Sequence, residues 1–296
     1  MESRDPRLVE IGVAADRPQL KIRYRKAAEL VGPSSAHPLR RSLCGIAVGP
    51  RDRIHVLGDD EVRVFSAETG ELLGRWPAPP ESLCLAVDSE EWVWMGRSGR
   101  VDAFDGAGKA MGGFPVAPAG KPATVTSVKA YGKEILVADA SARHIRRYDR
   151  LGRPLGEIGT RNKTRGFMLP NRWLDIAVDP SGVIRATDTG RHQVTAWKLD
   201  GEPAGRFGKF GLQSPGDFVG CCNPVNVAAA PGGRIVTAEK VAARVKIYDS
   251  EGNLLGLIGP EHFDPRCVHI PLAVDSKARI LAGDPVRLGV SIFEQE

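Results

Sequence analysis

Three cysteine residues are the first candidates for chemistry, because a thiolate binds soft metals and takes part in redox reactions. Cys221 and Cys222 are adjacent, and Cys267 follows later in the chain. With His269 or His262 as a fourth ligand, these thiols could hold zinc or an iron–sulfur centre. The cysteines therefore raise the hypothesis of a redox or metal-binding protein with a thiol site at Cys221, Cys222 and Cys267.

A structural interpretation of the same cysteines stays open. Neighbouring side chains of an extended segment point to opposite sides, so at most one of Cys221 and Cys222 naturally faces Cys267. Buried cysteine is also a common small core residue. Lys240 favours the functional hypothesis, because a nearby ammonium group lowers the pKa of a thiol.

A carboxylate recurs at one position of a repeated pattern. It follows the second apolar segment in four copies, as Asp139, Asp188, Glu239 and Asp284, whereas Gly58 and Gly96 stand there in the first two. Such a carboxylate can accept hydrogen bonds from the backbone N–H groups of the next turn. Several of them could instead hold a divalent cation through oxygen ligands. The repetition favours the structural role, and with Lys240 and Arg244 these four residues are candidates for a channel or loop-face site.

The segments that position these residues form a repeat. The stretch 171–208 contains four short runs with period-two alternation, separated by turn sequences rich in Asp and Gly. Its first run recurs six times at intervals of about 40 to 50 residues, as 45–48, 85–88, 126–129, 176–179, 226–229 and 272–275. This alignment matches Lys129 with Val178. Four strands repeated at this period are typical of a β-propeller blade.

The third run of each repeat ends in an aromatic residue, which suits packing between neighbouring blades. The sixth copy ends at Phe293 without an outer strand, and the alternating run 20–24 has no blade of its own. We therefore predict an all-β, single-domain, six-bladed β-propeller of four-stranded antiparallel blades over residues 1–296. An N-terminal strand, 18–26, would complete the last blade and close the ring. The expected blades span 43–80, 81–120, 121–168, 169–216, 217–265 and 266–296.

The segments ILVAD (135–139), IRRYD (145–149) and DTGRHQV (188–194) resemble the NHL repeat. This resemblance implies a six-bladed β-propeller and extends over about residues 43–293. The Cys-Cys-Asn-Pro motif at 221–224, followed by TAEK (237–240) and RVKIYD (244–249), is similar to a subgroup of bacterial NHL-repeat proteins without an assigned role.

Composition and charge narrow the class of protein. The net charge of +5 is spread over 296 residues without a run of five basic residues, so we expect no nucleic-acid partner. The apolar stretches are too short for a membrane span. Five cysteines form an odd set, which suits a reducing compartment. We expect a cytoplasmic protein, or an exported one if a leader has been removed.

Three functions are compatible with these observations. We favour a non-enzymatic binding scaffold, in which the channel mouth and the loops 159–172, 208–224 and 259–271 on one face recognise a protein, peptide or carbohydrate. The first alternative is the thiol protein described above. The second is a propeller enzyme of the lactonase or lyase type with a channel metal. The sequence contains no recognisable nucleophile motif, so it identifies no catalytic residue.

Overall fold

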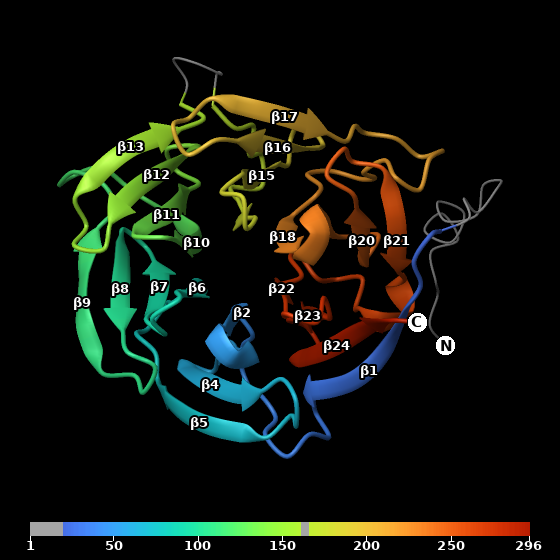
Figure 1. The fold of residues 1–296 in the computed structure, drawn as a ribbon, viewed down its shortest axis with the longest axis horizontal. Coiled ribbons are helices and arrows are strands. Elements are labelled where there is room, and N and C mark those ends of the chain that lie inside the picture. Colours follow the sequence, from blue (N-terminus) through green and yellow to red (C-terminus); the bar gives the residue numbers. More distant parts are fainter. Residues whose placement is uncertain (1–19, 161–165) are drawn as a thin grey trace.

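Six four-stranded antiparallel sheets surround a central axis, as the blades of a propeller (Figure 1). The computed structural model describes residues 20–160 and 166–296. Helical structure in these residues is limited to three short 3-10 turns, Pro50–Asp52, Pro231–Gly233 and Pro260–His262. No helix among them has the length and apolar character needed to cross a membrane. The predicted six-bladed architecture is confirmed.

Each of blades 1 to 5 consists of four consecutive strands, ordered from the axis outwards. Blade 1 contains β2 (Gly45–Gly49), β3 (Arg53–Gly58), β4 (Glu61–Ser66) and β5 (Leu72–Pro77). Blade 2 contains β6 (Cys84–Val87), β7 (Val93–Arg97), β8 (Arg100–Phe104) and β9 (Ala110–Pro115). Blade 3 contains β10 (Val125–Tyr131), β11 (Glu134–Asp139), β12 (His144–Asp149) and β13 (Pro154–Ile158). Blade 4 contains β14 (Ile176–Val178), β15 (Ile184–Asp188), β16 (Gln193–Trp197) and β17 (Pro203–Phe207). Blade 5 contains β18 (Asn226–Ala230), β19 (Arg234–Glu239), β20 (Arg244–Tyr248) and β21 (Leu254–Ile258).

The N-terminal strand closes the ring in blade 6. This blade combines β22 (Leu272–Val274), β23 (Ile280–Asp284) and β24 (Gly289–Gln295) with β1 (Tyr24–Val31), and β1 lies antiparallel beside β24 (Figure 1). The expected strand, 18–26, was placed too early, and residues 18 and 19 lie outside the described residues. Ile22 precedes the strand and donates its N–H to the carbonyl of Leu255 in β21, at 3.0 Å. The first residues thus bridge blades 5 and 6 before pairing begins.

The hydrophobic core is divided among the six blade interfaces. Each interface holds one cluster of buried side chains drawn from two adjacent sheets. Each cluster contains the third-strand aromatic residue of the later blade, namely Phe65, Phe104, Tyr148, Trp197, Tyr248 and Phe293. Aromatic side chains bury a large area each, so one residue per blade contributes much of the packing that holds neighbours together. The expected role of these aromatics is confirmed.

Glycine in the turn between the third and fourth strands allows close contact with the preceding blade. A Cβ atom at Gly152 would lie 2.3 Å from Cβ of Phe114, and one at Gly252 would lie 2.3 Å from Cβ of Phe207. Both glycines have positive φ, at 81° and 89°. The turn therefore needs glycine for its backbone conformation and for the space that the neighbouring aromatic occupies.

The strand register corrects the sequence alignment in blade 3. Ala130 pairs with Ile135, which lies opposite the aromatic Tyr148, just as Val178 pairs with Ile184 opposite Trp197. Ala130, and not Lys129, is therefore the counterpart of Val178. A register shift between Val125 and Ser127 adds one residue to β10 and accounts for the error.

A cavity of about 190 Å³ lies on the axis, lined by residues from all six innermost strands. The residues that line it are Ala, Val, Ile and Leu together with Lys129. The innermost strands therefore enclose a narrow channel whose lining residues are apolar except for Lys129, although more of its accessible wall is polar than apolar.

Candidate functional site

The four repeated carboxylates anchor the connections between blades. Each accepts a backbone N–H from the segment that enters the innermost strand of its own blade: Thr124 to Asp139 at 3.2 Å, Met168 to Asp188 at 2.9 Å, Val219 to Glu239 at 3.2 Å and Asp264 to Asp284 at 2.7 Å. Asp139 and Asp284 also accept N–H groups of the following turn. These bonds match the structural role that the repetition favoured.

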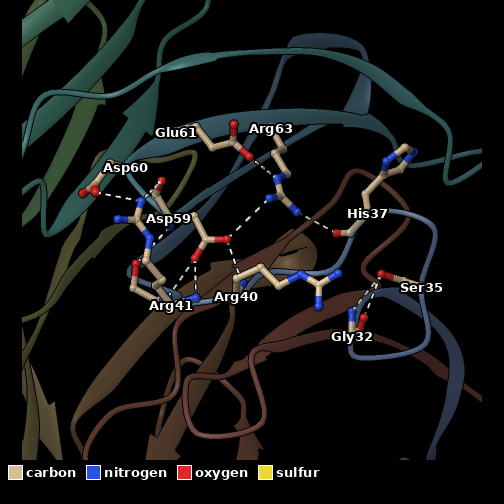
Figure 2. A network of polar contacts seen from close by, with 10 residues as sticks. Gly32, Ser35, His37, Arg40, Arg41, Asp59, Asp60, Glu61 and Arg63 are labelled. Carbon is tan, nitrogen blue, oxygen red and sulfur yellow. Dashed lines mark hydrogen bonds and ion pairs between the residues drawn. The ribbon is translucent and has the colours of Figure 1, made fainter.

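A fifth carboxylate plays the same part in blade 1, where the sequence suggested none. Asp59 follows Gly58 by one residue and accepts N–H groups from Arg40 and Arg41 at 2.7 Å each (Figure 2). The Arg63 guanidinium lies 3.6 Å from this carboxylate and donates to the carbonyl of His37 at 2.6 Å. In blade 2 the cation and the acid exchange places. Arg97, at the end of the second strand β7, donates to Asp102 in the third strand at 2.7 Å. A search for an acid at one fixed position misses both arrangements.

Glu239 belongs to a buried ionic cluster. Its carboxylate contacts Arg244 at 3.3 Å and forms an ion pair with Lys246, and the Glu239 and Lys246 side chains are fully buried. The Lys246 ammonium also donates to the carbonyl of Asp217 at 2.5 Å and lies 4.9 Å from the ring centre of Phe218. Burial lowers the pKa of Lys246 to about 8, and the neighbouring Glu239 carboxylate opposes this effect. The cluster fixes the loop 208–224 against blade 5.

The structure brings two of the three candidate thiols into contact. The Sγ atoms of Cys221 and Cys222 are 2.9 Å apart; Cys221 is exposed and Cys222 is buried. Burial raises the pKa of Cys222, the contact with Cys221 adds to this effect, and the Lys240 charge opposes it. Cys267 instead donates from Sγ to Oδ1 of Asp284 at 3.2 Å, and burial raises its pKa to about 12. Cys267 is therefore a protonated donor.

The two histidines proposed as ligands make aromatic contacts. His269 stacks on Trp173 with ring centres 5.0 Å apart, and His262 lies 5.0 Å from the ring of Phe293. Within residues 20–160 and 166–296, no three His, Cys, Asp or Glu side chains form a group that could hold a metal ion. Of the residues in the predicted thiol site, Cys221 and Cys222 are therefore in contact with each other. Cys267 and the two histidines have the other partners described above.

One end of the channel is bordered by a chain of polar contacts that the sequence did not reveal. Thr126 donates from Oγ1 to the carbonyl of Leu174 at 2.7 Å, which joins blades 3 and 4. The Asp175 carboxylate accepts from Nδ2 of Asn226 at 2.9 Å, joining blades 4 and 5. The Asn226 side chain accepts from the N–H of Ile270 at 2.9 Å, joining blades 5 and 6. Three successive blade interfaces are therefore linked at this mouth.

Trp173 and His269 lie at the same mouth, because each immediately precedes a residue of this polar chain. Their contact joins the segments that enter the innermost strands of blades 4 and 6. Burial lowers the pKa of His269, and the Asp175 charge opposes that effect. Nε1 of Trp173 is buried without a hydrogen-bond partner among the described residues.

The face that carries the connections between blades and the turns between second and third strands is called here the connection face. Six of its residues over blades 4 to 6 are large, apolar and exposed: Met168, Phe210, Leu212, Val241, Val268 and Val286. Val268 is 69% exposed and Phe210 56%. Among the described residues, four exposed cations accompany them, namely Arg172, Lys209, Arg266 and Arg287. We call these ten residues the apolar–basic surface.

Three of these cations lie beside carboxylates of the same face: Lys209 is 3.8 Å from Asp217, Arg266 is 2.8 Å from Asp264, and Arg287 is 3.6 Å from Asp284. Asp188, Glu239 and Asp284 are buried and hydrogen-bonded, while Glu261 is an exposed acid on the loop 259–271. The apolar–basic surface therefore combines apolar side chains with exposed cations, three of which are paired with carboxylates.

Similarity to known proteins is confined to the fold. No protein-family model and no curated protein sequence matches the chain. Among solved structures, a streptogramin B lyase has a TM-score of 0.63 at 9% identity, covering 92% of this chain and 98% of the lyase. A gluconolactonase from Xanthomonas campestris has a TM-score of 0.64 at 18% identity, covering 87% of each chain. The virginiamycin B lyase from Staphylococcus aureus has a TM-score of 0.56 at 12% identity, covering 92% of this chain and 88% of the lyase. These similarities support the propeller fold that the strands themselves define.

Proposed function

We propose that this chain is a binding scaffold whose connection face, over blades 4 to 6, docks a protein or peptide segment carrying acidic residues beside apolar ones. The observation that supports this proposal is the apolar–basic surface. Large apolar residues gathered at an exposed site often mark a protein interaction surface. Loops held by a rigid scaffold are the usual place for recognition.

The exposed cations of the surface favour an acidic partner, which would compete with the carboxylates that pair with three of them. Exposed cations steer an acidic segment and select against basic ones, while the apolar side chains contribute affinity once water is excluded. The buried carboxylates of these blades hold the backbone of the loops and turns, so the surface is preformed. Preorganisation of this kind lowers the entropic cost of binding.

A peptide display library tests the proposal with a defined probe. Selection on the wild-type chain should enrich sequences with acidic residues flanking apolar ones. The double variant Val268→Asp with Arg266→Glu should lose this enrichment. The matched control is Leu151→Asp with Arg153→Glu on the opposite face, because it also combines an exposed apolar residue with an Arg that contacts a nearby Asp. Equal enrichment by both variants, or none by the wild type, would contradict the proposal.

A second candidate function is thiol redox chemistry at Cys221 and Cys222. It is favoured by the 2.9 Å contact between their sulfur atoms and by the exposure of Cys221. This candidate function uses Cys221 and Cys222 but not Cys267, the third cysteine of the thiol hypothesis. An enzyme of the lyase or lactonase type is the alternative suggested by similarity of fold alone.

A further inference from the structure

At one position of the six innermost strands, blade 3 carries a lysine where the other five blades carry an alanine. The register aligns the six innermost strands through their pairing with the second strands, and it places Ala47, Ala86, Lys129, Ala177, Ala228 and Ala273 at equivalent positions. Five blades therefore present a methyl group to the channel region, and blade 3 presents a long side chain with a positive charge.

Lys129 lines the axial cavity and is the one ionisable residue among the residues that do so. The structure pairs no carboxylate with its ammonium group within the described parts of the chain. Asp175, at the channel mouth, already accepts hydrogen bonds from Nδ2 of Asn226 at 2.9 Å and from the N–H of Val227 at 3.0 Å. The nearby Cys84 stays protonated, since burial raises its pKa to about 12 and the Lys129 charge lowers it only in part. The cavity therefore has one cationic side chain among apolar residues, and its accessible wall also includes polar atoms.

We propose that the central channel binds a small monocarboxylate, with its carboxylate on the Lys129 ammonium and its hydrocarbon part against the Ala and Val side chains. A single negative charge matches the single cation, whereas a multiply charged anion would enter the narrow channel with charge left uncompensated. A cavity of about 190 Å³ accommodates roughly six groups of the size of water. Butanoate has this size. The proposal is independent of the apolar–basic surface.

Calorimetric titration with sodium butanoate tests this site, with butanamide as a neutral ligand of the same shape. Butanoate should bind the wild-type chain at one saturable site, and butanamide should bind at least tenfold more weakly. Lys129→Met should weaken butanoate binding at least tenfold. Lys129→Arg, which keeps the charge, should bind within about threefold of the wild type.

Lys133→Met is the matched control, because Lys133 is exposed on the turn that follows β10 and does not line the cavity. It should bind butanoate as the wild type does. Circular dichroism of each variant checks that the propeller is intact. The proposal is overturned if the wild type shows no saturable binding, if a folded Lys129→Met variant binds butanoate equally well, or if butanamide binds as tightly as butanoate.

Discussion

The carboxylate of Asp175 accepts a hydrogen bond from Nδ2 of Asn226 at 2.9 Å, across the interface between blades 4 and 5. Both residues are buried, and they occupy equivalent positions at the start of their innermost strands. Because Asn226 also accepts from Ile270 of blade 6, two side chains connect three blades at the channel mouth.

Replacement of Asp175 by Ala should destabilise the chain. It leaves Nδ2 of Asn226 and the N–H of Val227 buried without their acceptor. Each buried unsatisfied group costs about 1 to 3 kcal/mol, so we expect a loss of about 3 kcal/mol in the free energy of unfolding. Urea denaturation measures this loss. Asp200→Ala, in an exposed turn, is the control and should cost less than about 1 kcal/mol. Equal losses in both variants would refute the assigned role of Asp175.

Replacement of Lys246 by Met should lower the free energy of unfolding more when made alone than when Glu239 is changed as well. The single variant leaves the Glu239 carboxylate buried with Arg244 as its remaining cation, and we expect a loss of about 3 kcal/mol. The double variant Glu239→Gln with Lys246→Met removes the uncompensated charge and should recover part of this loss. A double-mutant cycle of unfolding free energies measures the coupling, and strictly additive losses would argue against it.

His55 should make the chain less stable in acid. Burial lowers the pKa of His55 from 6.5 to about 4, so the unfolded chain takes up this proton at a higher pH than the folded one. Stability from neutral His55 is therefore fully present above pH 6.5 and declines as the pH falls towards 4. The contribution is about 3 kcal/mol. Unfolding free energies of the wild type and His55→Gln, compared from pH 7 to 4, measure it. An unchanged difference between the two proteins over this range would contradict the assignment.

Oxidised glutathione should convert Cys221 and Cys222 into a disulfide. The two thiols lose two protons and two electrons, and the oxidant is reduced to two molecules of glutathione. Because burial raises the pKa of Cys222, the reaction should accelerate with rising pH as more thiolate forms. Peptide mass spectrometry after blocking the free thiols locates the bond. Detection of the oxidised bond at another cysteine pair would exclude this second candidate function.

The blade count and the ring closure follow from sequence because they rest on repetition. Six aromatic residues recur at one strand position, and the missing outer strand of the last repeat required a partner from the N-terminus. The start of that strand was placed too early, since the alternation of 20–24 does not distinguish a bridge to Leu255 from pairing with β24.

Side-chain contacts between distant segments could not be predicted in the same way. Lys129 was aligned one position out of place because a single added residue in β10 leaves no mark in the hydrophobic pattern. The contact of Asp175 with Asn226 joins residues from different repeats, and neither belongs to a recognisable motif. A lysine inside an innermost strand was the available signal for the channel, and it becomes informative once the register is known.

The most direct test of the proposed interaction surface is hydrogen exchange of backbone amides, with and without a peptide selected from the display library. The proposed function predicts slower exchange in the loops 208–224 and 259–271, and unchanged exchange in the turns between third and fourth strands on the opposite face. Protection confined to those opposite turns, or no protection at saturating peptide, would contradict it.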